Sequence, residues 1–405
     1  MHTKNIGLYI HIPFCKKKCE YCDFKSYAGQ EALIDEYIKW LNYEIELVGK
    51  SNQADYENGL DKLAVVNTIY IGGGTPSFIE EKHIKEILDA IKKNYVFPIN
   101  LEEKVEVTIE VNPGTVNEEK LKTYKASGIN RLSIGLQETH NEILKNIGRI
   151  HTYQDFLETY QTARKVGFDN INVDLMLALP GQSIEDLSES VDRIIKLNPE
   201  HISVYSLIIE EGTPFYKKYM NNELKLPEDE IERKMYWLVK KRLEEAGYKH
   251  YEISNFAKPG YESKHNLACW NQEEYIGLGV SAHSYTNNLR YSNIDNIPNY
   301  IQNLKSGKDY LNLVVHEKQT KESKMKEFIM LGLRKIDGVY IQNFKEKFGE
   351  NPIYLYRKEF EKLVQEELLE IDGDVIRLTN KGLDLANLVW EEFVWPWTFG
   401  TLLKV

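Results

Sequence analysis

Cysteine is scarce in this sequence, and several other features are missing. Four cysteines in 405 residues are too few for a chain of this length to depend on disulfides. No apolar run approaches the roughly 18 residues of a membrane span, and the start MHTKNIGLYIHIPFC lacks the basic and apolar regions of a signal peptide. The formal net charge of -11 argues against broad nucleic-acid binding, which depends on Lys and Arg. We therefore expect a cytoplasmic protein with a small-molecule or protein partner and no nucleic acid.

Short β-rich stretches alternate with longer amphipathic ones from residue 6 to about residue 290. This alternation predicts an α/β fold in which parallel strands are connected by crossover helices. At least six β/α units fit the pattern. The expected strands lie in IGLYIHI, VVNTIYIGGG, VEVTIEV, NRLSIGLQ, NINVDLML and HISVYSLII.

Three of these strands have one polar and one apolar face. A parallel strand between two helix layers should be apolar on both faces, so one polar face favours a barrel with a site in its lumen. A solvated face of an open sheet is the alternative. The polar faces carry Glu106, Thr108 and Glu110 in the first strand, Arg131, Ser133, Gly135 and Gln137 in the second, and Asn172, Asp174 and Met176 in the third.

The pattern changes between residues 290 and 320, where a connector with Pro298 and Gly307 replaces the alternation. Helices are expected near 321–334, 340–348, 353–366 and 381–394, with a hairpin turn at Asp372-Gly373. We therefore predict a barrel with its extension over residues 1–300 and a smaller helical, winged-helix-like domain over residues 301–405. The acidic run EKLVQEELLEIDGD makes a DNA-binding role for that domain improbable.

The stretch HIPFCKKKCEYCDFKSYAG contains Cys15, Cys19 and Cys22, with gaps of three and two residues. Three thiolates could serve a zinc site, a disulfide with a spare thiol, or an iron-sulfur cluster. Structural zinc usually takes four ligands from two spaced pairs, and downstream only the isolated Cys269 could complete such a set. A 4Fe-4S cluster held by three cysteines leaves one iron open for a substrate or cofactor.

The spacing Cys-x3-Cys-x2-Cys, with Tyr21 before the last cysteine, resembles the signature of the radical S-adenosylmethionine (SAM) superfamily. The resemblance implies that SAM binds the open iron and that an electron from the cluster cleaves it to a 5'-deoxyadenosyl radical. IGGGTPS at 71–77 resembles the glycine motif of that superfamily. Glycines there let the backbone approach a ligand closely and adopt positive φ.

Further stretches resemble the family that joins the oxygen-independent coproporphyrinogen III oxidases (HemN) to the heme chaperones (HemW). They include IEVNPGT, GINRLSIGLQ, IGRIHT, NVDLMLALPGQ and YEISNFAKPGYESKHNLACWNQEEYIGLGVSAHSY. The resemblance implies an incomplete parallel (β/α)6-type radical SAM barrel followed by a HemN-C-like helical domain. It implies that Cys15, Cys19 and Cys22 hold the cluster. The implied SAM contacts are Tyr9, Tyr21, Gly73, Gly74, Thr75, Glu110, Gln137, Arg149 and Asp174.

Two departures favour the chaperone branch over the oxidases. HemN-type oxidases carry a fourth cysteine two residues after the third, where this chain has Phe24, and an N-terminal extension, where this chain has only 14 residues before Cys15. The stretch HNLACW resembles the His-Asn-x-x-Tyr-Trp motif associated with heme binding, which implies His265 as a heme ligand. Cys269 replaces the usual tyrosine, and either adds an axial thiolate or is buried and inert.

The sequence therefore predicts a carrier that binds heme and transfers it to acceptor hemoproteins, membrane-associated respiratory proteins among the candidates. SAM cleavage is optional for such a carrier, which would act as a monomer or a heme-linked homodimer. The alternatives are oxidative decarboxylation of coproporphyrinogen III and another radical SAM reaction. Trp390, Trp395 and Trp397 are expected to pack on the barrel or small domain, or else to form a docking surface.

Overall fold

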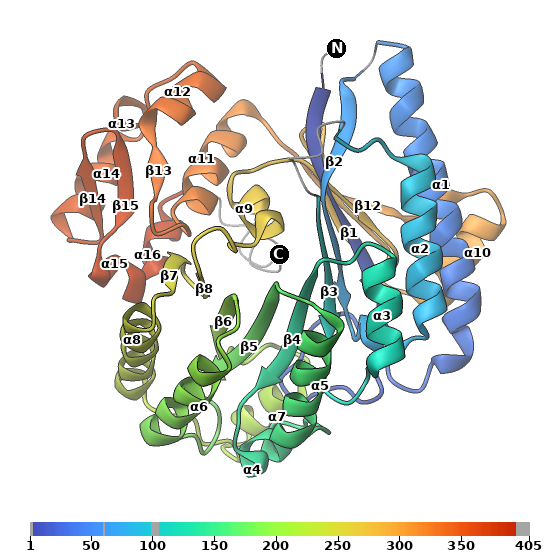
Figure 1. Cartoon of the computed structure of the whole chain (residues 1–405). Helices are drawn as coiled ribbons and strands as arrows, with labels where there is room; N and C mark the ends of the chain where they lie inside the picture. The colour runs from blue at the N-terminus through green and yellow to red at the C-terminus, as the bar shows by residue number, and fades with distance from the viewer. Residues whose placement is uncertain (1–2, 60, 99–104, 394–405) are drawn as a thin grey trace.

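The computed structural model describes residues 3–59, 61–98 and 105–393 (Figure 1). Within these residues one sheet has twelve strands in the order β12-β11-β10-β9-β1-β2-β3-β4-β5-β6-β8-β7, and a second has three in the order β13-β15-β14. The strands are β1 Thr3–Ile12, β2 Leu63–Gly73, β3 Glu106–Val111, β4 Arg131–Gln137, β5 Ile171–Leu177, β6 His201–Ser206, β7 Lys249–Glu252, β8 Asn255–Ala257, β9 Tyr275–Leu278, β10 His283–Thr286, β11 Leu289–Asn293, β12 Leu313–Lys318, β13 Val339–Tyr340, β14 Leu369–Asp372 and β15 Val375–Leu378.

The helices alternate with the first six strands and then gather in the C-terminal part. No described helix combines the length and the apolarity that a bilayer crossing requires. The helices are α1 Ile34–Glu57, α2 Glu81–Asn94, α3 Glu118–Ala126, α4 Asn141–Asn146, α5 Tyr153–Val166, α6 Ile184–Leu197, α7 Pro214–Met220, α8 Asp229–Glu245, α9 Lys264–Trp270, α10 Ile297–Lys305, α11 Lys321–Gly332, α12 Ile341–Phe348, α13 Pro352–Leu355, α14 Arg357–Gln365, α15 Asn380–Asp384 and α16 Ala386–Glu391.

Strands β1 to β6 are parallel and consecutive, which confirms the predicted incomplete barrel of β/α units. Two features lie beyond the prediction. β9 pairs in parallel with the outer side of β1, and antiparallel strands extend the sheet at both edges. The sheet curves with α1, α2, α3, α5 and α6 outside it, while α9 lies within the curve (Figure 1).

Local sequence signals account for the helices that close each unit. Ser183 and Asp186 form a capping box at the start of α6, each side chain accepting a backbone N–H of the other residue. Gly167 ends α5 in the left-handed conformation, with φ of +96°. The apolar faces of the alternating strands, for example Ile109 in β3 and Val173 in β5, are fully buried in the main core. Their polar faces are therefore left to the lumen.

The C-terminal part contains its own hydrophobic core, which begins at Met325. The predicted domain boundary between residues 300 and 301 lies inside α10, whose Ile301 packs in the first core. The single helix expected at 353–366 is wrong: it divides into α13 and α14 at Tyr356, whose buried ring packs edge-on against Phe393. Trp390 packs on this second core, whereas Trp395 and Trp397 lie outside the described residues.

A buried ion pair fastens the C-terminal part to the extended sheet. Arg290 of β11 donates from Nε to Oε1 of Glu327 in α11 over 2.7 Å. The other carboxylate oxygen of Glu327 accepts from the amides of Gln272 and Gln319 at 2.7 and 2.9 Å. The Glu327 side chain is only 4% exposed, so its charge depends on these three donors.

We expect Glu327→Ala to lower the free energy of unfolding by about 3–5 kcal/mol, because it strands the buried Arg290 guanidinium. Urea unfolding at neutral pH measures this loss. Glu350→Ala is the matched control, since its ion pair with Lys321 is exposed and contributes about 1 kcal/mol or less. Equal effects of the two variants would contradict a special role for the buried pair.

Candidate functional site

The cysteine loop, from Pro13 to Tyr27, follows β1 and is fixed to two distant segments. Its ends meet, because Tyr27 N donates to Pro13 O over 2.7 Å. In its middle, Glu20 N donates to Ile147 O over 3.2 Å, and Glu20 O accepts from Phe215 N over 3.0 Å. The loop is therefore held by α4 and by the start of α7, far away in the sequence.

The three thiols of this loop are free, with Cys15 buried and Cys19 and Cys22 partly buried. Burial raises the pKa of Cys15, and burial followed by the charge of Cys19 raises the pKa of Cys22 to about 11. Thiolates here therefore need positive charge beside them, which iron ions would supply. Among the described residues, no group of three His, Cys, Asp or Glu surrounds a common point for one metal ion. The three cysteines of an iron-sulfur cluster do not have to surround one common point, because each of them binds a different iron ion.

The glycine motif lies against the cysteine loop with almost no space between them. Gly73 has φ of +114°, and a Cβ there would lie 2.6 Å from the ring of His11. A Cβ on Gly74 would lie 3.0 Å from Ile12 O, the same oxygen that accepts the Gly74 N–H at 2.9 Å. Glycine is therefore required at both positions by close contact with protein atoms, and the positive φ expected in this motif occurs at Gly73.

Polar contacts join the cysteine loop, the glycine motif and the strand ends into one group. Thr75 Oγ1 lies 3.4 Å from Cys15 Sγ and accepts from Asn112 Nδ2 at 2.9 Å. Arg149 donates from Nη2 to Asn112 Oδ1 at 2.7 Å and from Nη1 to Cys19 Sγ at 3.6 Å. The sequence analysis missed Asn112, although its position directly after a predicted strand was a usable signal. Two thiols therefore already have polar donors beside them.

Two predicted lumen carboxylates, Glu110 of β3 and Asp174 of β5, lie on strands that flank β4. Burial, followed by the charge of Asp174, raises the pKa of Glu110 to about 7. Its oxygens accept from Tyr70 Oη at 3.0 Å and from Gly73 N at 3.1 Å. Burial also raises the pKa of Asp174, which accepts from Asn172 Nδ2 at 2.7 Å. Such groups suit a polar or cationic ligand, because bringing one between them would stabilise their charged forms.

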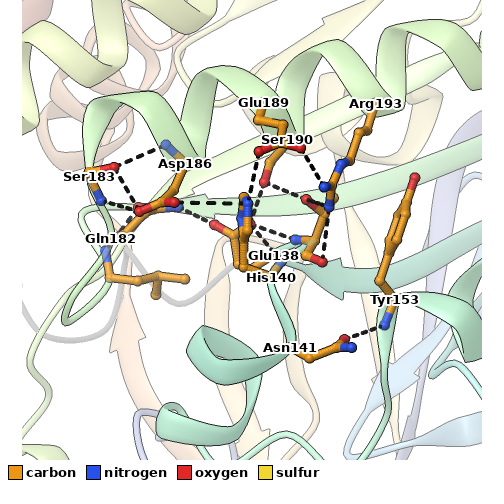
Figure 2. Close-up of polar contacts among 12 residues, drawn as sticks. Glu138, His140, Asn141, Tyr153, Gln182, Ser183, Asp186, Glu189, Ser190 and Arg193 are labelled. Atoms are coloured by element: carbon orange, nitrogen blue, oxygen red, sulfur yellow. Dashed lines mark hydrogen bonds and ion pairs between the residues drawn. The ribbon is translucent and has the colours of Figure 1, made fainter.

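Gln137 ends β4 in the left-handed conformation, with φ of +75°, and the β4–β5 register shifts at this point. The next residue, Glu138, is fully buried and was missed by the sequence analysis. Figure 2 shows its carboxylate between the turn after β4 and helix α6. The carboxylate accepts from Gln182 Nε2 at 2.5 Å, from Ser190 Oγ, and from the N–H of Thr139 at 2.6 Å. Glu138 thus fixes the turn that carries Gln137.

His265 lies at the opposite end of the lumen. Its Nδ1 is 2.9 Å from Thr68 Oγ1, and its backbone N–H donates to Glu106 Oε1 at 3.1 Å. Its ring stacks on that of Tyr70, with centroids 5.3 Å apart. Thr68 lies five residues before Gly73 on β2, so His265 is roughly 17 Å from the glycine motif along that strand. Two sets of bonds hold the first turn of α9 in this position. The Ser263 side chain caps the helix, and Glu106 accepts the backbone N–H groups of Lys264 and His265.

The structure thus brings most, but not all, predicted residues together. At the carboxyl ends of the strands it assembles Cys15, Cys19, Cys22, Gly73, Gly74, Thr75, Gln137 and Arg149. Tyr9 lies in the lumen, with its hydroxyl 2.9 Å from His11 Nδ1 and its ring stacked on Tyr70. Tyr21 packs towards Phe215, with ring centroids 6.5 Å apart.

Cys269 is buried in a separate apolar cluster with Trp270, Tyr275 and Met330, between the sheet extension and α11. Burial raises the pKa of its thiol to about 12. The thiol is therefore protonated at neutral pH, which agrees with the expectation of an inert core cysteine.

Comparisons with known proteins give two family matches and close relatives over nearly the full length. Residues 9–194 match the Radical SAM superfamily, and residues 319–385 match the HemN C-terminal domain. The chain is 39% identical to the heme chaperone HemW of Bacillus subtilis (strain 168), over 95% of this chain and 98% of the relative. It is 37% identical to the heme chaperone HemW of Lactococcus lactis subsp. lactis (strain IL1403), over 97% and 98%.

Among solved structures, the chain resembles coproporphyrinogen III oxidase (HemN) from Escherichia coli, a radical SAM enzyme. The TM-score is 0.80 at 22% identity, covering 96% of this chain and 90% of the other. At that identity the likeness shows a shared fold.

We expect Glu138→Ala to lower the free energy of unfolding by about 3 kcal/mol or more, because buried donors lose their acceptor. It should also weaken SAM binding, because the turn that carries Gln137 loosens. Urea unfolding and calorimetric titration of SAM measure the two effects. Glu189→Ala, next to Ser190 on α6, is the control: its side chain is 54% exposed, so its loss should change the free energy of unfolding little. Normal SAM binding by Glu138→Ala would contradict the link to Gln137.

Proposed function

The chain belongs to the HemW family within the radical SAM superfamily, and we propose that it binds heme and passes it to acceptor hemoproteins. Cys15, Cys19 and Cys22 are proposed to hold a 4Fe-4S cluster with SAM beside it. His265 is proposed as the residue that ligates the heme iron.

The chemistry of His265 carries the heme proposal. Burial, followed by the charge of Arg131, lowers the pKa of His265 to about 4, so the imidazole is neutral at physiological pH. In the tautomer that donates its Nδ1 hydrogen to Thr68 Oγ1, the lone pair of Nε2 is available for iron. No hydrogen bond joins Nε2 to any residue that the structure describes. A neutral, oriented histidine inside a polar lumen is the form of this side chain that binds iron.

The heme end and the SAM end share one lumen, which supports a single site with two ligands. Tyr70 stacks on His265 and donates its hydroxyl hydrogen to Glu110 Oε1 at 3.0 Å. Glu110 in turn accepts from Gly73 N at 3.1 Å. Tyr70 therefore contacts both the proposed heme ligand and a carboxylate proposed to hold SAM.

The residues around the thiols are suited to hold a cluster in place. When bound, the cluster would supply a one-electron reductant next to SAM. Thr75 can donate to Cys15 and Arg149 to Cys19, and both contacts favour thiolates over thiols. Arg149 keeps an unpartnered buried Nε, a donor that suits the SAM carboxylate.

The rival activity, oxidation of coproporphyrinogen III, is less well supported. Phe24 replaces the cysteine that marks those oxidases, and its side chain is 60% exposed at the cysteine loop. The likeness to the solved oxidase is one of fold. The deciding experiment gives anaerobically reconstituted protein either heme, or coproporphyrinogen III with SAM and a reductant. A stable heme complex, with heme moving to an apo-hemoprotein, supports the proposal. Formation of protoporphyrinogen IX would overturn it.

We expect His265→Ala to lose most of its heme affinity, at least about tenfold, while its iron and sulfide content stays normal. Loss of an iron ligand costs far more than loss of one ordinary hydrogen bond. Titration followed by the heme absorption band measures the loss. Cys269→Ala, on the same helix, is the matched control and should bind heme as the wild type does. Unchanged heme binding by His265→Ala would remove this residue as the ligand.

SAM affinity should fall as the pH decreases through about 7. The raised pKa of Glu110 means that this carboxylate takes up a proton below that pH, and only its ionised form attracts the SAM ammonium. We expect about tenfold weaker binding at pH 6 than at pH 8, measured by calorimetry. Glu110→Gln should bind SAM weakly and with no such slope. A slope that persists in Glu110→Gln would place the titrating group elsewhere.

A further inference from the structure

Arg131, the first residue of β4, is a buried charge to which no described residue is hydrogen-bonded. Its side chain is 2% exposed, and its Nε has no hydrogen-bond partner. No ion pair or hydrogen bond connects its guanidinium to any residue within 3–59, 61–98 or 105–393. A guanidinium that is buried without a hydrogen-bond partner destabilises the fold, so folding alone gives no reason to keep it.

The guanidinium lies among lumen side chains from several elements. Burial, and after it the charge of Arg131, lowers the pKa of His201 on β6 and of His265 on α9. The same charge opposes the raised pKa values that burial gives to Tyr70 on β2, Asp174 on β5 and Tyr251 on β7. The strand alternation also placed Arg131 on the polar face of β4, with Ser133 and Gln137. Arg131 therefore points into the lumen, where its charge acts on His265 of α9.

The carboxylates and amides near Arg131 are occupied by other donors. Asp174 accepts from Asn172 Nδ2 at 2.7 Å and from Ser133 Oγ at 3.4 Å. Glu106 accepts the backbone N–H groups of Lys264 and His265, both at 3.1 Å. None of these acceptors bonds Arg131, so its donor groups are available to a ligand in the lumen.

The lumen is open beside this group. Tyr70 and Asp174 are only partly buried, and Tyr205 on β6 is 41% exposed. A ligand that reaches Tyr70 therefore reaches the neighbourhood of both Arg131 and His265.

We propose that Arg131 binds a carboxylate of the ligand held in the lumen, and that this carboxylate is a propionate of heme. The planar donor fork of arginine matches a carboxylate in two parallel hydrogen bonds. Heme carries two propionates at its edge, so iron at His265 and a propionate at Arg131 would fix both the position and the rotation of the ring. The assignment rests on the proposed function, because it takes heme as the ligand.

The test compares heme with heme dimethyl ester, which lacks the free carboxylates, on the full-length reconstituted protein. Arg131→Met keeps the apolar volume of the side chain and removes its charge. We expect this variant to bind heme about tenfold more weakly or worse, as for loss of a charged hydrogen bond, and the ester as well as the wild type does. Its thermal midpoint without heme should be unchanged or higher, since an unpaired buried charge has been removed.

Arg164→Met is the matched control. Arg164 pairs with Glu200 at 2.7 Å, outside the lumen on α5, so its loss should lower the thermal midpoint and leave heme affinity unchanged. A lower midpoint for Arg131→Met with unchanged heme affinity would show a structural arginine and overturn the proposal. Equal weakening for heme and ester would also overturn it, because no carboxylate contact would then be involved.

A SAM titration distinguishes the other carboxylate source. Weaker SAM binding by Arg131→Met, with normal heme binding, would assign the carboxylate to SAM and overturn the propionate assignment. If the wild type binds neither heme nor the ester, the proposed function fails, and the propionate assignment fails with it. If the wild type binds heme and Arg131→Met binds it equally well, only the propionate assignment fails.

Discussion

The close backbone contact between the glycine motif and the start of the cysteine loop is the constraint on which the rest of the site depends. Gly74 N donates to Ile12 O and Thr75 N to Phe14 O, both at 2.9 Å, so the parallel pairing of β1 and β2 continues beyond the strands. Cys15 follows Phe14 directly and Glu110 bonds Gly73, which means that the loop and the lumen carboxylate share one anchor. A side chain on Gly74 would separate them.

A second constraint is the division between an apolar outer face and a polar inner face on each strand. The outer faces build the main core under the helices, and they stabilise the barrel enough to tolerate unfavourable groups inside it. Burial raises the pKa values of Glu110 and Asp174, and Arg131 is buried with no partner for its Nε. Such groups lower the stability of the ligand-free fold, and a ligand of complementary charge would recover that loss.

Sequence reasoning succeeded where one strand or one turn carries the information. Period-two alternation assigned Glu110, Arg131 and Asp174 to the lumen, because this signal is local to each strand. It failed where distant segments meet. The contact of Arg149 with Asn112 and the burial of Glu138 under α6 depend on how β/α units pack, and no periodicity records that. The contact of α9 with Glu106 and the pairing of β9 with β1 also join segments that are far apart in the sequence.

The two ends of the lumen differ in chemistry, and this difference bears on how a radical SAM fold could serve as a carrier. The carboxyl ends of the strands gather thiols, glycine backbone and Arg149, a set suited to a cluster and an amino acid group. The other end offers a neutral histidine and an unpaired arginine, a set suited to a metal-centred ring with an acidic edge. Tyr70 touches both sets, through its ring on one side and its hydroxyl on the other. Tyr70 therefore connects Glu110 directly to the ring of His265, so a single side chain lies between the two ends.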